Sequence, residues 1–119
     1  MRDRRQAERA GRLAEDAAAL FLMAKGYQIV ARRFRARGGE IDLVARRRDV
    51  LAFIEVKRRP SLDEAVFAVG PRTRRRIQRA AAQFLAARPE LAGLGGRYDI
   101  LASAGLRMRH LRGAWLEGD

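Results

Sequence analysis

The stretch from Gly39 to Lys57 constrains the fold of this chain most strongly. It holds two runs of β-branched and large apolar residues, separated by four polar residues, Arg46, Arg47, Arg48 and Asp49. Two such runs around a short polar segment are typical of antiparallel strands joined by a tight turn. The stretch therefore predicts a β-hairpin.

The predicted hairpin carries charged residues on one face of each strand. Successive side chains point to opposite faces of a strand, so Glu40 and Asp42 share a face, as do Glu55 and Lys57. The opposite faces are then filled by apolar side chains, namely Ile41, Leu43, Ile54 and Val56.

The length of the turn decides whether these charged residues meet. A two-residue turn at Arg48 and Asp49 would set Asp42 directly opposite Glu55, with Lys57 nearby. A loop with an odd number of residues would shift the register and set Asp42 opposite an apolar side chain. The hypothesis of an acidic patch therefore depends on the two-residue turn.

Helix and strand patterns alternate along the rest of the chain. From Gln6 to Lys25, apolar residues recur at spacings of three and four, which predicts an amphipathic helix with a stripe of Ala7, Ala10, Leu13, Ala14, Ala17, Ala18, Phe21 and Ala24. The other patterns predict a strand over residues 27–34, before the hairpin, and a second helix over residues 72–88. Two later strands are predicted over residues 97–104 and 106–115.

This order of elements predicts an α/β (α+β) fold, in which helices flank a central mixed sheet: a helix, a three-strand antiparallel meander, a helix and further strands. The chain of 119 residues is long enough for one hydrophobic core. We expect a single domain over residues 1–119, with residues 1–5 as a flexible basic N-terminus.

Basic residues dominate the charge of the chain. There are 26 lysines and arginines against 14 acidic residues, for a net charge of +12. This excess favours nucleic acid as a partner, because basic side chains neutralise phosphates and release counterions. An arginine-rich composition that only aids solubility is the alternative. No apolar run approaches the length of a membrane span, so we expect a cytoplasmic protein without a membrane partner.

The scarcity of cysteine and histidine indicates that a metal site in this chain would use oxygen ligands. The chain has no cysteine and one histidine, His110, which argues against zinc sites and Ser-His-Asp triads. The carboxylates of Asp42 and Glu55 suit Mg²⁺ or Mn²⁺, which would offset the cost of burying two like charges. Lys57 is one of only two lysines, and an ammonium can lose a proton as guanidinium cannot. An exposed cross-strand ion pair is the alternative.

Two further groups of charged residues allow alternative interpretations. Glu15 lies beside the apolar stripe of the first helix, where its carboxylate either turns toward the domain or pairs with an arginine in solvent. Arginines crowd the start of the second helix, which the helix dipole disfavours unless an anion binds there. A solvated basic face is the alternative for this set, Arg72, Arg74, Arg75, Arg76 and Arg79.

These motifs resemble a known protein family. The segments Gly39-Glu40-Ile41-Asp42 and Glu55-Val56-Lys57, twelve residues apart, resemble the Asp…Glu-x-Lys signature of the PD-(D/E)xK nuclease superfamily. The chain also carries Gly11-x-x-Ala14-Glu15, Arg35-x-x-Gly38-Gly39, Glu64-Ala65-Val66 and Arg97-Tyr98-Asp99. With these segments it resembles, over residues 8–115, the YraN family of predicted bacterial endonucleases, which are similar to archaeal Holliday junction resolvases.

The resemblance implies a restriction-endonuclease-like core and a metal-dependent endonuclease that hydrolyses DNA phosphodiester bonds, with selectivity for branched DNA. It makes Asp42 and Glu55 ligands of Mg²⁺ or Mn²⁺, with the Val56 carbonyl as a third ligand. Lys57 would position or deprotonate the attacking water. Glu15 would complete the site through the metal or its waters.

Further roles follow from the same resemblance. Glu40 would contact the metal ligands without binding the metal itself. A resolvase needs two active sites, so the resemblance also implies a homodimer. The clustering of basic residues, and not the resemblance, predicts that backbone phosphates are held by Arg58, Arg59, Arg72, Arg75, Arg76 and Arg79. No small-molecule cofactor is implied. The sequence departs from the family at Arg33, where Asn is common, and at Ile41, where the superfamily has Pro. A non-catalytic nucleic-acid-binding module with the same fold is the alternative.

Overall fold

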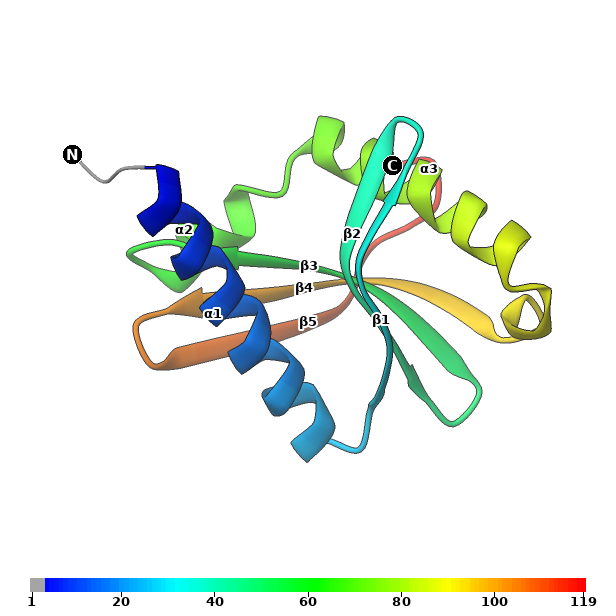
Figure 1. The fold of residues 1–119 in the computed structure, drawn as a ribbon, viewed down its shortest axis with the longest axis horizontal. Helices are drawn as coiled ribbons and strands as arrows, with labels where there is room; N and C mark the ends of the chain where they lie inside the picture. The colour runs from blue at the N-terminus through cyan, green and yellow to red at the C-terminus, as the bar shows by residue number, and fades with distance from the viewer. Residues whose placement is uncertain (1–3) are drawn as a thin grey trace.

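The computed structural model describes residues 4–119, which form one five-stranded mixed sheet flanked by helices (Figure 1). The strands lie in the order β1-β2-β3-β4-β5; β3 and β4 are parallel and the other neighbours are antiparallel. The elements are α1 (Arg4–Ala24), β1 (Gln28–Ala36), β2 (Gly39–Arg47), β3 (Val50–Arg58), α2 (Leu62–Phe67), α3 (Pro71–Ala87), the 3-10 helix η1 (Pro89–Leu91), β4 (Gly95–Ala104) and β5 (Arg107–Trp115). The predicted α+β fold is confirmed.

The structure describes only the last two residues of the segment expected as a flexible basic N-terminus, residues 1–5. Helix α1 already begins at Arg4, and residues 1–3 lie outside the described residues. Within residues 4–119, no helix is both long and apolar enough to span a membrane.

Helices α1 and α3 pack on opposite faces of the sheet. On β2, Leu43 packs in the cluster under α1, whereas its neighbour Val44 packs in the cluster under α3. The buried face of α1 is formed by Ala14, Ala18, Ala19 and Leu22. The predicted stripe was therefore wrong at Leu13, which is 62% exposed, because the buried positions run through every fourth residue from Ala14. Three further residues of that stripe, Ala7, Ala17 and Ala24, are exposed as well.

The β2–β3 hairpin has the predicted register. Arg48 and Asp49 form a two-residue turn, and pairing runs from Arg47–Val50 to Leu43–Ile54. Asp42 and Glu55 are the next positions in line. The expected two-residue turn is confirmed, but strand pairing ends one position before Asp42 and Glu55, which meet through their side chains.

The two strands of this hairpin separate just beyond Leu43 and Ile54. From there β3 pairs only with β4, while the first residues of β2 pair only with β1. Figure 1 shows the far end of the β1–β2 hairpin leaving the sheet and reaching α3. Ile41 accordingly packs in the cluster under α3, so the prediction that it shares a face with Leu43 was wrong.

Close contact with α3 explains this separation. A Cβ on Gly39 would lie 1.9 Å from the carbonyl oxygen of Arg76, so only glycine permits the approach. The Arg79 Nε donates to the Gly38 carbonyl at 2.9 Å. The amide of Gln83 bonds both the N–H and the carbonyl of Arg37, at 3.1 and 2.7 Å. These contacts hold the tip of the β1–β2 hairpin on α3 and away from β3.

Candidate active site

A pocket of about 350 Å³ opens where β2 leaves β3, and we call it the acidic pocket. Small residues of α1 form one wall: Ala7, Ala10, Gly11 and Ala14. The remaining lining residues are those predicted as a site from sequence, Glu15, Glu40, Asp42, Glu55, Val56 and Lys57, followed by Arg58 and Arg59. The structure thus gathers residues from one helix and two strands around a single opening.

Asp42 is fixed at the point of separation. Its Oδ2 accepts a hydrogen bond of 2.8 Å from the backbone N–H of Val56. The side chain thereby takes the place of a strand-to-strand bond that the diverging β2 no longer supplies. This contact keeps the Asp42 carboxylate beside the backbone of β3, next to Glu55.

Glu55 is held in a setting that disfavours its charge. Burial raises the pKa of the Glu55 carboxyl to about 9, and a hydrogen bond with Asp42 and repulsion from its charge add to this effect. The charge of Lys57 opposes the shift, whereas that of Glu40 reinforces it. Two carboxyl groups in contact favour either a shared proton or a bound cation between them.

The donor set of the acidic pocket fits a hard divalent cation with an incomplete protein shell. Within residues 4–119, no three acidic or histidine side chains are arranged to hold a metal. An ion here would take the carboxylates of Asp42 and Glu55, the Val56 carbonyl and water. This composition suits Mg²⁺, which usually keeps several waters and one or two carboxylates.

Glu15 lines the acidic pocket but pairs with an arginine. The Arg33 Nε donates to its two carboxylate oxygens at 2.9 and 3.2 Å. The Glu15 side chain is only 13% exposed, so its pairing with Arg33 is partly shielded from water. Of the two alternatives in the sequence, pairing with an arginine is observed, at a position that also faces the pocket.

The backbone of Arg33 makes this ion pair reachable. Arg32 binds Asp16 of α1, and adjacent strand residues should point to opposite faces. Arg33 nevertheless also reaches α1, because its φ of 51° turns the chain into the left-handed region. Asparagine tolerates that conformation better than arginine does. Sequence reasoning did not assign Arg33 to the site.

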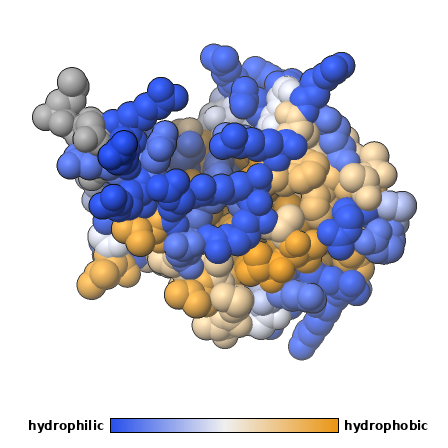
Figure 2. Space-filling model, in the orientation of Figure 1, coloured by the Kyte–Doolittle hydropathy of each residue, from blue (hydrophilic) through white to orange (hydrophobic). Residues whose placement is uncertain are grey.

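A second pocket of about 400 Å³ adjoins the first, and we call it the arginine pocket. It shares Gly11, Glu15, Glu40 and Asp42 with the acidic pocket, and its other lining residues are Glu8, Arg12, Arg33, Arg35 and Ile41. Figure 2 shows hydrophilic residues gathered over the N-terminal half of α1 and the surface beside it. The acidic centre therefore lies between arginines on two sides.

The arginines predicted on the second helix lie apart from these pockets. None of Arg72, Arg75, Arg76 and Arg79 lines the acidic or the arginine pocket, since α3 packs on the other face of the sheet from α1. The Nε of Arg79 is engaged by Gly38. A role of these four residues in binding phosphate stays a prediction, and it would concern a separate contact.

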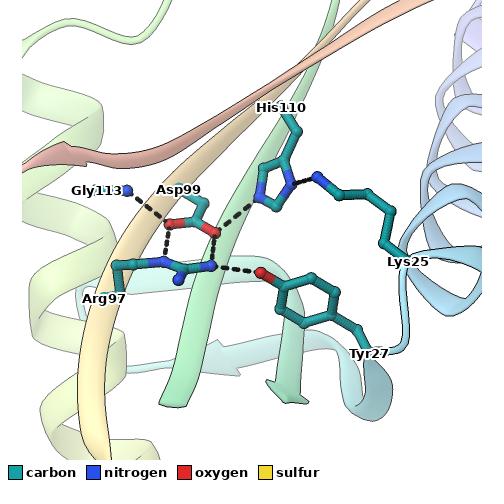
Figure 3. A network of polar contacts seen from close by, with 6 residues as sticks. All are labelled: Lys25, Tyr27, Arg97, Asp99, His110 and Gly113. Carbon is teal, nitrogen blue, oxygen red and sulfur yellow. Dashed lines mark hydrogen bonds and ion pairs between the residues drawn. The ribbon is translucent and has the colours of Figure 1, made fainter. Parts of the chain in front are cut away.

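A buried polar network connects α1 to the far edge of the sheet (Figure 3). The Asp99 carboxylate accepts two bonds from Arg97, at 2.8 and 2.9 Å, and one from Gly113 N–H, and contacts His110 at 2.8 Å. Burial alone would raise the pKa of Asp99, but the hydrogen bonds of His110 and Arg97 outweigh it and lower the pKa. Lys25 contacts the other ring nitrogen of His110. The network fixes β4 on β5, and sequence reasoning missed it.

Comparison with known proteins identifies relatives along nearly the whole chain. It is 52% identical over 114 residues to a UPF0102 protein of Paramagnetospirillum magneticum, covering 92% of this chain and 88% of the relative. It is 50% identical to a UPF0102 protein of Maricaulis maris, covering 99% of this chain and 94% of the relative. The model of uncharacterised protein family UPF0102 matches residues 14–102. The chain therefore belongs to the UPF0102 family.

Proposed function

We propose that this protein is an endonuclease that hydrolyses DNA phosphodiester bonds with Mg²⁺ or Mn²⁺. One observation carries the proposal: β2 separates from β3 where Asp42 and Glu55 align, and this opens a pocket that Lys57 also lines. A purely structural ion-pair ladder would not need the strands to part. The net charge of +12 supports a nucleic-acid substrate.

The residues of the acidic pocket divide the chemistry among themselves. Asp42, Glu55 and the Val56 carbonyl would hold the cation, which supplies a Lewis acid for the phosphoryl oxygen and acidifies a bound water. Lys57 orients the attacking water and stabilises negative charge that develops on the phosphate. Arg58 and Arg59, at the rim, hold the DNA backbone.

The substrate and assembly follow the resemblance to junction resolvases. We expect cleavage of branched DNA to exceed that of linear duplex, and a homodimer to present two acidic pockets to one junction. Recognition rests on backbone phosphates, since no motif for reading base edges occurs in the sequence.

A metal-dependent cleavage assay tests the proposal. Branched, flapped and linear DNA are incubated with Mg²⁺, Mn²⁺ or EDTA, using wild type, Asp42→Ala, Glu55→Ala and Lys57→Ala. Glu64→Ala, on the exposed surface of α2, is the matched control. We expect cleavage by the wild type and the control only. Binding without cleavage under every metal would favour the non-catalytic module, and undiminished cleavage in all three variants would refute the assigned site.

A further inference from the structure

The ion pair between Arg33 and Glu15 occupies two groups that the proposed reaction would use separately. Glu15 lines the acidic pocket, and Arg33 lines the arginine pocket beside it. Both hydrogen bonds run from the Arg33 Nε. Neither Nη group of Arg33 has a hydrogen-bond partner within residues 4–119. The guanidinium therefore still has donors to offer in the arginine pocket.

The position of Arg33 places this guanidinium next to the acidic centre. On β1 it lies between Arg32 and Phe34, which pair with Leu43 and Ile41, so the facing residue on β2 is Asp42. The charge of Asp42 acts on the guanidinium of Arg33. A φ of 51° is costly for a residue other than glycine or asparagine. The chain keeps arginine here despite that cost.

A phosphate is the ligand that fits the arginine pocket. Arg12, Arg33 and Arg35 line it together with four acids, Glu8, Glu15, Glu40 and Asp42; Arg33 pairs with Glu15, and the Arg35 Nε lies 3.9 Å from Glu40. The arginines are the groups in this pocket that can take a phosphate, because a guanidinium fork binds phosphate oxygens through two parallel N–H donors. The pocket is continuous with the acidic pocket through Glu15 and Asp42. A strand whose scissile phosphate lies over the acidic centre would thus bring a neighbouring phosphate to Arg33.

We propose that the arginine pocket binds the phosphate next to the scissile one, and that Arg33 exchanges Glu15 for this phosphate when a DNA strand enters. The exchange frees the Glu15 carboxylate for the acidic pocket only when substrate is present. Arg33 is thus a positioning residue that couples strand binding to completion of the site. This inference rests on the proposed function, since it places the substrate strand across the same acidic pocket.

Binding of a fluorescent branched DNA, the proposed substrate, in EDTA, measured from 50 to 300 mM salt, tests the exchange without any cleavage. We expect Arg33→Asn, which suits the left-handed backbone, to weaken binding about 3- to 10-fold and to lower the salt slope by about one. Arg32→Asn is the matched control, because Arg32 pairs with Asp16 and lines neither pocket. It should leave the slope unchanged.

A double-mutant cycle separates exchange from simple charge addition. Glu15→Gln releases Arg33, so it should tighten strand binding several-fold in wild type and markedly less in Arg33→Asn. Equal effects of Glu15→Gln in both backgrounds, or a slope in Arg33→Asn equal to that of Arg32→Asn, would overturn the inference. A wild type that binds with this coupling but never cleaves would refute the nuclease alone, and a wild type that does not bind would refute both.

Discussion

Replacing Glu55 by glutamine should stabilise the protein, and more so as the pH rises. The carboxyl of Glu55 has its pKa raised from an ordinary 4.5 to about 9 by burial and by Asp42. Between these two values the folded protein binds more protons than the unfolded chain, so stability falls as the pH increases. The stabilising contribution of the protonated Glu55 carboxyl is complete below about pH 4.5 and is lost as the pH rises to about 9. Glutamine resembles the protonated acid and does not titrate.

The size of the stability gain depends on how far the pH lies above the pKa of Glu55 in the unfolded chain. One pKa unit corresponds to about 1.4 kcal/mol, so the interval from 4.5 to 7 sets a ceiling of about 3 kcal/mol at pH 7. Glu55 lines an open pocket, and solvent and relaxation reduce this penalty. We expect Glu55→Gln to gain about 1–2 kcal/mol at pH 7, or roughly 3–8 °C in Tm, and nothing at pH 4.5.

Urea unfolding at pH 4.5, 6, 7 and 8.5 in EDTA measures this difference. Glu64→Gln, an exposed glutamate of α2, serves as control and should change stability by at most a few tenths of a kcal/mol at any pH. Addition of Mg²⁺ should stabilise the wild type and not Glu55→Gln. A loss of stability in Glu55→Gln at every pH, or a gap that does not widen with pH, would refute the contact between the two carboxyl groups.

Four other substitutions test three separate parts of the structure. Gly39→Ala should lower the free energy of unfolding in urea by about 2–3 kcal/mol, since its Cβ would meet the Arg76 carbonyl at 1.9 Å. Gly11→Ala, in open space on α1, should instead raise it by about 0.5–1 kcal/mol. Equal effects of the two substitutions would refute the close packing of Gly39 on α3. Asp99→Asn should cost about 3 kcal/mol at pH 7 and less as the pH falls through the lowered pKa of Asp99; a pH-independent loss would contradict its charged state. Lys57→Arg should retain oligonucleotide binding and lose roughly 100-fold in cleavage rate; full activity would show that only the charge matters.

The alignment of the acids could be predicted because it depends on local pattern. Two apolar runs and a polar turn fix a register, and that register brings Asp42 and Glu55 to the end of the paired region, where their side chains meet. The separation of β2 from β3 could not be predicted in the same way. It arises from the contact of Gly39 with Arg76, which lies far along the chain. The paired glycines were visible, but they also fit a flexible turn.

Other differences have a similar long-range origin. The arginines of α3 were predicted to bind phosphate because they crowd the start of a helix, yet α3 covers the opposite face of the sheet from α1. The pairing of Arg33 with Glu15 depends on one left-handed residue within a strand, and its only sequence signal was an arginine where Asn is common. Asp99 lies in an ordinary alternating strand pattern, which did not indicate its burial beside Arg97 and His110, although Arg97-Tyr98-Asp99 was one of the segments that carry the family resemblance.

Mn²⁺ binding by isothermal titration calorimetry tests the central claim most directly. At pH 7 we predict one Mn²⁺ per chain, no binding in Asp42→Asn, and binding heats that vary with the ionisation enthalpy of the buffer, because the metal displaces the proton held by Glu55 and Asp42. Absence of Mn²⁺ binding by the wild type, or equal binding by Asp42→Asn, would contradict a metal centre in the acidic pocket.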